Sequence, residues 1–492
     1  MTTLDGDVVF RYSRLILPFA GALLVLSAAG GSAQQPAAPV PAALCPAPPC
    51  GAAPTEPARA DVLEPFVREA IRNNLGFQQQ RLVAERSEAA VTQARGLFLP
   101  SVSLEARYSE MSGGLDLGEL VNPAYQALNE ITGAQRFPTN IDGRFPFAQE
   151  TKVRIAQPIF QPAVIANYRI QKSLRGLEGA RLRAGARTLA AAVQLGYVNY
   201  ARAQRVVELY RSTLELVDEA VRVNESLLAN GKVTPVAVHR ALADRSEIEQ
   251  QIAEAEQRLA AARRQFNFTL GRAADVPVPA IADSLLVREL NITAPAAVQR
   301  ALLAREEIEQ ADWGIRAAEA QQRLAGSSYL PGISIAVDYG VQGNDYRFDS
   351  RHDVTVASLV LSWNLFNGGQ DAARRQQAAV DARRTLIGKQ EAEQQIELQV
   401  RQAHDAVVVS QQAIVAAQAR VSAARRAFEL MRRRYTEGVA SQLEYLDART
   451  SLTSAELNWI LTRHQYVANY IELERVAALR TLDLSEAERK RP

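Results

Sequence analysis

Two stretches of the chain, 231 residues apart, read LFLPSVSLEARY (residues 97–108) and SYLPGISIAVDY (residues 328–339). Pro100 in the first stretch aligns with Pro331 in the second. In both, a Leu-Pro pair is followed by residues that alternate between apolar and polar, which is the pattern of a β-strand with two unlike faces. The recurrence of this pattern indicates an internal duplication of the chain.

Two further matches extend the repeated unit. QPIF (residues 157–160) matches WNLF (residues 363–366) at an offset of 206, and Gly231 matches Gly438 at an offset of 207. The offset is smaller here than at the two prolines, and a single loop accounts for the difference. This loop runs from about Ser112 to Ala148 in the first copy, and it shrinks to about Gln342 to Arg351 in the second.

Each copy contains the same predicted order: an amphipathic helix, two strands, a very long helix, a glycine turn and a shorter helix. The opening helix has apolar residues at helical spacing, and its counterpart is residues 297–325; the spaced residues are Leu63, Phe66, Val67, Ala70, Ile71 and Leu75. Long helices are expected at about 164–230 and 371–437, and shorter ones at about 234–270 and 441–479. A helix of about 65 residues is roughly 100 Å long, against a usual length of about 12 residues, so the pattern predicts a rod or tube.

The predicted strands carry the signal for a membrane. Apolar and polar residues alternate at 101–108, 152–159 and 333–339, and the fourth strand, at 355–363, is more apolar throughout. Such strands are typical of a transmembrane barrel, but a half-buried soluble sheet alternates in the same way. Four strands are too few to enclose an aqueous channel, and open edges are not tolerated in lipid. A barrel therefore requires several copies of the chain, and three copies supply twelve strands.

The first 33 residues have the features of a secretory signal peptide. Arg11 and Arg14 precede an apolar run at 15–29, and the small residues that follow predict cleavage after Ala33. The apolar run is shorter than the roughly 20 residues of a membrane-spanning helix. No later stretch of the sequence is apolar enough for such a helix, so a spanning role has to use strands.

Both cysteines, Cys45 and Cys50, lie in a Pro/Ala-rich leader at residues 34–60. Such a segment cannot bury a core. Cys45 is a candidate for lipid attachment, although Leu44 stands where lipid-attachment signals have a small residue. A local disulfide in an oxidising periplasm, or two thiols without a role, is the favoured alternative.

The charge balance argues against nucleic acid as a partner, and the missing catalytic motifs argue against an enzyme. The chain has 56 basic and 54 acidic residues, a net charge of +2, so no polyanion is indicated. The sequence contains no Gly-rich phosphate loop, nucleophile elbow or metal cluster, and no cofactor is expected. The histidines are scattered, and none pairs with a second ligand at metal spacing: His239, His352, His404 and His464.

The repeat, the element order and the local sequence motifs together resemble the TolC-type outer-membrane efflux protein family, over about Asp61 to Leu479. These motifs include Phe160 and Phe366, where the chain returns from strand to helix, and the segment from Gly438 to Arg449. The resemblance implies an α+β fold in which duplicated long helical hairpins build a periplasmic α-barrel. Four strands from each protomer then contribute to a trimeric, twelve-stranded transmembrane β-barrel in the outer membrane of a Gram-negative cell.

The two glycine turns are candidate docking sites. Gly231 and Gly438 permit the left-handed backbone of a tight helix reversal, and Thr234 or Ser441 can cap the helix that follows. A plain hairpin turn needs no more than this. The resemblance adds that the exposed tip residues bind a periplasmic adaptor protein; those residues are Val233, Val439 and Ala440.

The resemblance also places an acidic ring at the periplasmic constriction, and the matching positions are Glu444 and Asp447. They lie at i, i+3 on one helix face, where a threefold assembly would stack two rings of carboxylates that attract cations and raise one another's proton affinity. An ordinary solvated helix face is the alternative. Tyr435 matches a tyrosine that holds the family's closed entrance by hydrogen bonds.

The usual partners of that tyrosine are missing from this chain. Ala237 stands where an aspartate is expected, and Ala440 stands where an arginine is expected. Arg432, Arg433 and Arg434 precede Tyr435 and either supply other closing bonds or face solvent. The closed entrance is therefore expected to be held by different residues in this chain.

The predicted organisation follows from these observations. It comprises a signal peptide (1–33), a leader (34–60), a first repeat (61–275), a linker (276–292), a second repeat (293–482) and a tail (483–492). The predicted function is passive conduction from an inner-membrane transporter, of the proton-driven RND or the ATP-driven ABC type, and its adaptor through the outer membrane. A soluble periplasmic coiled-coil scaffold or adaptor is the main alternative; a periplasmic enzyme with helical arms lacks a convergent polar site.

Overall fold

The computed structural model describes residues 62–110, 115–141, 144–145, 148–282, 288–343 and 352–480. The predicted signal peptide, the whole leader with Cys45 and Cys50, and the tail from residue 483 lie outside the described residues. Much of the short loop expected between the third and fourth strands lies outside them too.

Each copy opens with two consecutive helices, where the sequence pattern predicted one. The first copy has α1 (Glu64–Asn73) and α2 (Leu75–Gly96), and the second has α6 (Ala294–Ala304) and α7 (Glu306–Gly326). The breaks fall at Asn74 and Arg305, whose backbones are extended, with ψ angles of 119° and 132°. These two residues are 231 positions apart, so the break occurs at the same place in both copies.

Hydrogen bonds of polar side chains stabilise the chain at both helix breaks. Asn74 accepts a hydrogen bond from the backbone N–H of Phe77 at 3.0 Å, which caps α2, and it donates to the carbonyl of Thr269 at 3.0 Å. Arg305 is buried and donates to Glu307 and to Gln399. Each break therefore satisfies its polar groups by contact with another part of the fold, which a helical periodicity cannot reveal.

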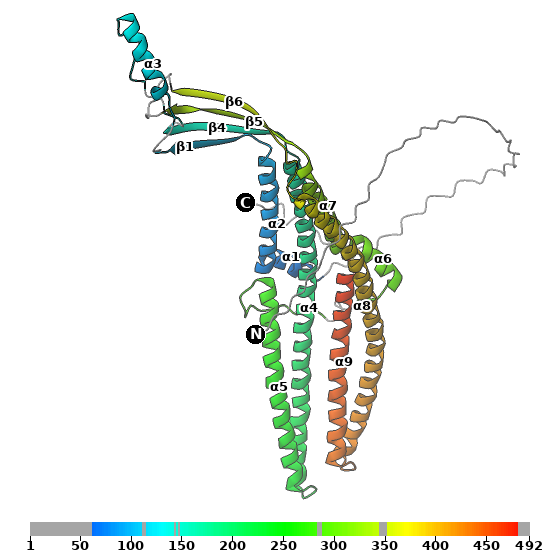
Figure 1. Cartoon of the computed structure of the whole chain (residues 1–492). Coiled ribbons are helices and arrows are strands. Elements are labelled where there is room, and N and C mark those ends of the chain that lie inside the picture. Colours follow the sequence, from blue (N-terminus) through cyan, green and yellow to red (C-terminus); the bar gives the residue numbers. More distant parts are fainter. Residues whose placement is uncertain are drawn as a thin grey trace, which may run out of the picture. The chain divides into compact units, whose positions relative to one another are not determined.

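The long helices have nearly the lengths that the sequence predicted. α4 (Pro162–Ala229) has 68 residues and α8 (Gln370–Thr436) has 67. α4 turns back into α5 (Pro235–Leu270), and α8 turns back into α9 (Gln442–Val476). The two hairpins lie side by side through a contact between α4 and α9 (Figure 1). Among the described residues, none of these helices has an apolar stretch that could cross a membrane.

The four predicted strands form one antiparallel sheet in the order β1-β4-β5-β6. The strands are β1 (Ser101–Tyr108), β4 (Gln149–Phe160), β5 (Gly332–Gly343) and β6 (Asp353–Ser362). Pairing of β4 with β5 joins the two copies of the repeat. Within the described residues β1 and β6 each pair on one side only, so both edges of the sheet stay open.

The register separates an apolar face of the sheet from a polar one. Leu104 lies opposite Val153, and Val153 lies opposite Tyr339. One position along each strand, Glu105 lies opposite Lys152, and Arg154 lies opposite Asp338. Because neighbouring residues point to opposite faces, the alternation predicted for each strand adds up to two continuous and chemically unlike surfaces.

The long loop expected at 112–148 contains a folded unit. It includes a 16-residue helix, α3 (Leu117–Thr132), and a small two-stranded sheet of β2 (Leu115–Asp116) and β3 (Arg144–Phe145). A signal was present in the sequence, since Leu117, Leu120, Leu128 and Ile131 have helical spacing. Pro123 lies inside the helix and weakens a helical reading of this stretch.

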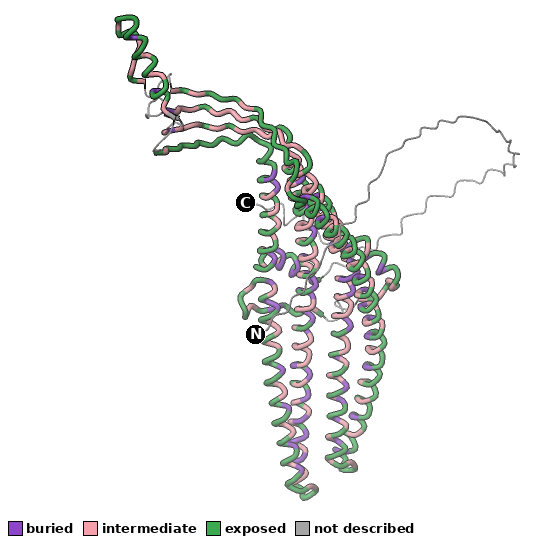
Figure 2. Tube along the Cα trace, viewed as in Figure 1, coloured by how far each residue is buried: buried purple, intermediate pink, exposed green. Residues whose placement is uncertain are grey.

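The largest hydrophobic core lies where α1 and α6 pack against the middle of α4 and α8 (Figure 2). Its centre is an aromatic cluster in which the ring of Phe66 lies 6.0 Å from Tyr197 and 5.4 Å from Phe266. The hydroxyl of Tyr197 donates to the carbonyl of Pro279 at 3.1 Å. The segment between the copies is thereby held against the long helices, and the two hairpins extend from a common base.

The contact of α4 with α7 allows a test of this packing. A Cβ atom at Gly176 would lie 2.4 Å from the ring of Trp313, whereas at Gly179, one turn along α4, the nearest atom would be Arg183 Nη1 at 3.8 Å. Gly176→Ala should therefore lower the free energy of unfolding by about 1–3 kcal/mol through overpacking. Gly179→Ala, the control, should leave it unchanged or raise it, because alanine favours helix.

The measurement is the thermal unfolding of the purified protein in detergent, followed by far-ultraviolet circular dichroism. Equal melting temperatures for the two variants would contradict the close contact of Gly176 with Trp313.

Candidate functional site

The two glycine turns form the ends of the helical hairpins. Gly231 has a φ of 67° and Gly438 a φ of 76°, so both adopt the left-handed backbone that was predicted for them. Val439 is 64% exposed, while Val233 and Ala440 are half-buried. The two turns that contain the predicted tip residues lie at the same end of the hairpins (Figure 1).

Only one of the two candidate capping residues accepts a hydrogen bond from the start of its helix with its side chain. Ser441 accepts a hydrogen bond from the N–H of Glu444, and the Glu444 carboxylate accepts from the N–H of Ser441 at 2.8 Å, which completes a capping box. Thr234 stands at the same place before α5 but makes no such bond. Pro235 has no N–H, and the N–H of Ala237 already donates to the backbone carbonyl of Thr234 at 3.0 Å.

The cap distinguishes the two predicted acidic residues. Hydrogen bonds from the backbone N–H and the hydroxyl of Ser441 lower the pKa of Glu444, opposite to the raised proton affinity expected for stacked rings. Asp447 is exposed one turn further along α9, and its carboxylate makes no hydrogen bond within the described part of the chain. The Glu444 carboxylate therefore stabilises the helix start, whereas the Asp447 carboxylate is exposed to solvent.

Tyr435 finds a partner that the sequence did not identify. Its hydroxyl donates to Asn224 Oδ1 at 2.7 Å, and both residues are almost completely buried. Asn224 lies on α4, so the bond joins the second hairpin to the first. The ring of Tyr435 also stacks on Tyr445, with centroids 4.8 Å apart, and burial raises the pKa of both tyrosines.

Two further contacts join α9 to α5. Gln442 donates to the backbone carbonyl of Ala237 at 2.7 Å. Ala237 stands where an aspartate is expected, and it joins α5 to α9 through its main chain instead of through a side chain. Arg449 donates to Asp244 Oδ1 at 2.6 Å. We call these two bonds and the Tyr435–Asn224 bond the tip contacts.

The Arg449–Asp244 ion pair is buried but only partly compensated. Their side chains are 6% and 14% exposed, and within the described residues one hydrogen bond joins them, while Arg449 Nε and Nη1 and Asp244 Oδ2 have none. Burial raises the pKa of Asp244 although Arg449 opposes this shift. The cost of desolvating two charges is offset only when the geometry is good and the remaining polar atoms are hydrogen-bonded, so this pair joins the hairpins at a high desolvation cost.

The three arginines before Tyr435 lie on the surface: Arg432, Arg433 and Arg434 are all exposed. The Arg434 carbonyl accepts from the N–H groups of Val439 and Ala440, at 2.8 and 3.1 Å, which shapes the turn. The backbone of Arg434 thus shapes the turn, and the three side chains face solvent, which is one of the two alternatives expected for them.

A network of charges covers the polar face of the sheet. Arg154 donates two hydrogen bonds to Asp338, both 2.8 Å, and Arg154 Nη1 lies 3.3 Å from Glu105. Lys152 lies 2.7 Å from Glu150, which in turn pairs with Arg107 at 2.9 Å. The network links β1, β4 and β5 and gives this face mixed charge, which suits contact with water.

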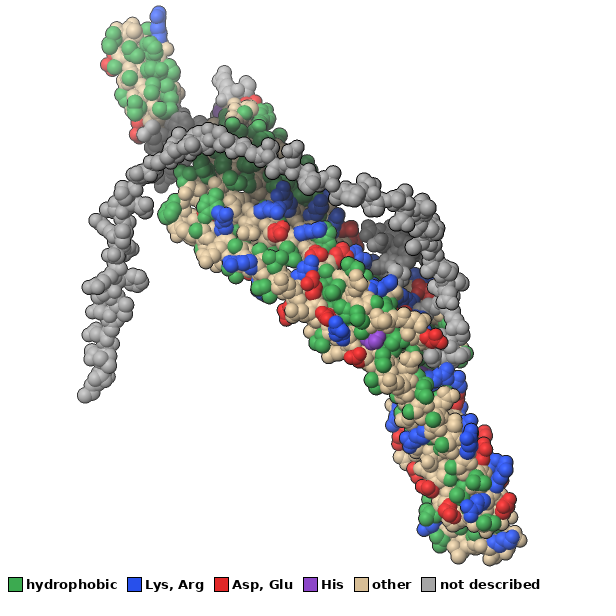
Figure 3. All heavy atoms as spheres, turned by 90° about the vertical axis from the view of Figure 1, so that its right-hand side faces the viewer, with side chains coloured by type: hydrophobic (Ala, Val, Ile, Leu, Met, Phe, Trp, Pro, Cys, Tyr) green, Lys and Arg blue, Asp and Glu red, His purple; other side chains and the backbone are tan. Residues whose placement is uncertain are grey.

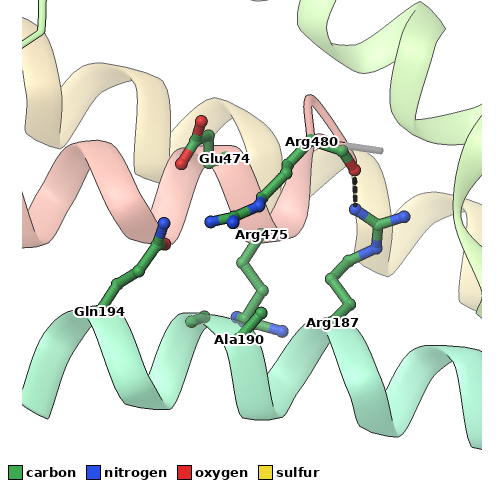
Figure 4. A pocket seen from close by; sticks show the side chains of 7 residues that line it. Arg187, Ala190, Gln194, Glu474, Arg475 and Arg480 are labelled. Atoms are coloured by element: carbon green, nitrogen blue, oxygen red, sulfur yellow. Dashed lines mark hydrogen bonds between the residues drawn. The ribbon is translucent and has the colours of Figure 1, made fainter. Parts of the chain in front are cut away.

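A small pocket between α4 and the end of α9 has basic walls, but its arginines serve the fold (Figure 4). Arg187 donates to the carbonyl of Arg480 at 2.8 Å and forms a two-bond pair with Glu306. Arg475 pairs with Glu472 at 2.6 Å, and Arg480 with Glu64. The Arg480–Glu64 pair joins the end of the second copy to the start of the first, and the Arg187–Glu306 pair joins α4 to α7.

The histidines are placed as ordinary residues of helices and loops. His464 is buried and bonds the carbonyl of Ile460 at 2.8 Å, and His404 Nε2 lies 3.2 Å from the carbonyl of Ile292. Among the described residues, no group of three or more His, Cys, Asp or Glu side chains could hold a metal ion.

The capping box predicts how the tip responds to pH. A carboxyl group with a lowered pKa stabilises the fold above its usual pKa, and this contribution is lost as the pH falls through the lowered value. We expect the amides at residues 441–445 to lose hydrogen-exchange protection in that acidic range. Glu444→Gln should show weaker protection already at neutral pH and no acidic step. Glu437→Gln at the same turn is the control, and an acidic step that persists in Glu444→Gln contradicts the assignment.

The chain matches the model of a known protein family at residues 66–272 and 297–479; that family is described as outer membrane efflux protein. It is 26% identical to outer membrane protein OprJ of Pseudomonas aeruginosa, over 66% of this chain and 70% of OprJ. It is 22% identical to the cation efflux system protein CusC of Escherichia coli, over 57% of this chain and 62% of CusC. It is also 22% identical to the alkaline protease secretion protein AprF of Pseudomonas aeruginosa, over 65% of this chain and 67% of AprF.

The fold is also found among solved structures. A crystal structure of CusC superposes with a TM-score of 0.71 at 17% identity, and the match covers 84% of this chain and 91% of that chain. The matched family model spans both helical hairpins and all four strands of the sheet. The chain therefore belongs to the outer membrane efflux protein family, and it is an outer-membrane channel protein for export.

Proposed function

We propose that three copies of this chain form a channel that passively conducts substrates from an inner-membrane transporter and its adaptor across the periplasm and the outer membrane. The open edges of the sheet support this assembly. Because unpaired backbone groups are not tolerated in lipid, β1 of one copy pairs with β6 of the next, and twelve strands close the barrel. The charged face with Arg154 and Asp338 then lines the water-filled lumen, and the face with Leu104 and Tyr339 contacts lipid.

The hairpin tips form the periplasmic entrance in this proposal. The observation that carries it is the set of tip contacts, all of which run between the two hairpins of one chain. While these contacts are intact, α8 and α9 stay against α4 and α5. When they separate, the second hairpin can move away from the first and widen the entrance, without chemical change in the channel itself.

Opening is driven from outside the chain. The turn residues Val233, Val439 and Ala440 are the proposed docking surface for an adaptor protein, because they are small, at least partly exposed and beside the tip contacts. Adaptor binding at the turns acts directly on the helix ends that the tip contacts hold. The energy for transport comes from the partner transporter, of the proton-driven or the ATP-driven class, and the channel needs no cofactor.

Asp447 is the proposed cation-attracting residue of the constriction. In a threefold assembly three Asp447 carboxylates surround the axis, with no hydrogen bond inside the described part of the chain to reduce their charge. Glu444 lies on the same face one turn away, but its carboxylate is engaged by Ser441. The ring is therefore made mainly by Asp447, with a smaller contribution from Glu444.

The tip contacts predict a leaky variant. Arg449→Ala leaves Asp244 buried without its partner, which costs roughly 3–5 kcal/mol for a buried pair, so the closed entrance should open at least tenfold more often. Arg425→Ala is the control, because Arg425 pairs with Glu456 at the same 2.6 Å on the exposed surface within one hairpin. An exposed pair contributes about 0–1 kcal/mol.

Single-channel recording in planar bilayers measures the open probability of both variants. Exchange of the two charges, Asp244→Arg with Arg449→Asp, should restore the closed state, which separates loss of the bond from general damage. The same open probability in Arg449→Ala and Arg425→Ala would count against the tip contacts as the closing device.

The acidic ring predicts a difference between two neighbouring substitutions. Asp447→Ala should reduce the preference for cations over anions and weaken block by divalent cations, because it removes the unengaged carboxylate. Glu444→Ala should have the smaller effect on both quantities. Reversal potentials under a salt gradient and titration with a divalent cation measure them. If neither substitution changes either quantity, the ring is assigned to the wrong residues.

A further inference from the structure

Helix α3 carries an apolar surface that the channel described above does not use. Six residues lie within about 100° of one another around the helix, at 100° per residue. We call them the outer stripe: Leu117, Leu120, Ala124, Ala127, Leu128 and Ile131. All six are exposed, with Leu120 at 71% and Ile131 at 82%. The space-filling view shows hydrophobic side chains over the rod formed by α3 (Figure 3).

The opposite face of α3 is held by polar bonds. The amide of Asn122 donates to the carbonyl of Ile141 at 2.8 Å and accepts from its N–H at 2.9 Å. Asn129 makes the same pair of bonds with Phe137, both 2.8 Å, and also accepts from the N–H of Arg136. These bonds fix the rotation of α3 against the returning chain, so the outer stripe cannot turn inward without breaking them.

The spacing of the outer stripe is that of a helix which packs on other helices. Residues 117, 120, 124, 127 and 131 follow intervals of three, four, three and four, the a/d pattern of a coiled coil. Alanines occupy the two middle positions, Ala124 and Ala127, and larger residues occupy the ends. Small residues in the middle of the seam allow identical helices to approach closely.

The charge of α3 disfavours a lipid surface as the partner. Asp116, Glu119 and Glu130 are acidic, and no Lys or Arg occurs between residues 115 and 132. Helices that lie on membranes have basic residues on their polar face, where they attract anionic headgroups. The charge thus disfavours an anionic lipid surface, and the coiled-coil seam favours packing on other helices, for which copies of α3 are available.

The topology brings identical copies to one place. β1 ends at Tyr108 and β4 begins at Gln149, so α3 lies at the end of the sheet away from α2 and α4 (Figure 1). In the threefold assembly proposed above, on which this inference rests, three copies of α3 surround the same end of the barrel. We propose that their outer stripes pack together there as a short three-helix cap, so that the channel is narrowed at both ends.

Disulfide crosslinking tests the cap. Cys45 and Cys50 are the only cysteines, and replacing both with serine provides a background for single cysteines. Leu120→Cys and Ala124→Cys should each form disulfide-linked dimers within the purified trimer upon mild oxidation, because a coiled-coil seam brings Cα atoms within about 7 Å. Gln126→Cys, exposed on the opposite side of α3, is the matched control and should yield several-fold less.

A second experiment, fluorescence quenching by brominated lipid, distinguishes packing of the outer stripe against other helices from contact with lipid. In bilayers, a fluorophore on Leu120→Cys should be insensitive to brominated lipid if the cap forms. Strong quenching without disulfide dimers overturns the cap in favour of a lipid contact, and neither quenching nor dimers overturns it in favour of exposure to water. Native mass measurement of the same samples distinguishes failure of the cap from failure of the proposed channel assembly. A trimer without crosslinks rejects the cap alone. A monomer rejects the channel assembly.

Discussion

The open edges of the four-stranded sheet are the constraint on which the rest of this structure depends. β1 and β6 present rows of backbone groups without partners in the described chain, and a membrane offers no water to satisfy them. Closure with other copies removes these edges. In the proposed trimer, this closure also places the polar face of each sheet toward one lumen, brings the helical hairpins of all copies around one axis, and gathers the α3 helices at the far end.

The periplasmic end of the molecule combines firm and weak elements. At the base of the hairpins, Phe66, Tyr197 and Phe266 form a closely packed core. At the tips, the hairpins are joined by hydrogen bonds and by one buried ion pair with polar atoms left unsatisfied within the described residues. A buried pair of this kind is weak evidence for stability, because desolvation of its charges offsets much of their attraction. In the proposed mechanism, this difference between tips and base lets the tips separate while the base stays intact.

The two acidic residues of α9 differ in what their carboxylates contact. Glu444 lies in the first turn and satisfies the N–H of Ser441, so its charge stabilises the helix start. Asp447 lies one turn later, beyond the unsatisfied donors of the helix end, and its carboxylate is exposed to solvent. Two carboxylates on one helix face can therefore have different roles, which depend on their distance from the N-terminus.

Much of the architecture could be predicted from the sequence, because it depends on periodicity. The alternation at residues 101–108 and 332–343, the uninterrupted helical stretches of α4 and α8, and the turn glycines Gly231 and Gly438 are all local patterns. The capping box of Ser441 and Glu444 was also present as Ser-x-x-Glu, and its effect on the pKa of Glu444 follows from local spacing.

The tertiary structure alone decided the contacts between distant segments. Asn224 and Tyr435 are 211 positions apart, and Asp244 and Arg449 are 205 apart, so no spacing in the chain relates them. The breaks at Asn74 and Arg305 depend on Thr269 and Gln399, which approach only in the fold. The sequence by itself thus determined the strands, the long helices, the turns and their order, since these depend on neighbouring residues. The helix breaks and the tip contacts depend on which helix faces meet, so only the tertiary structure decided them.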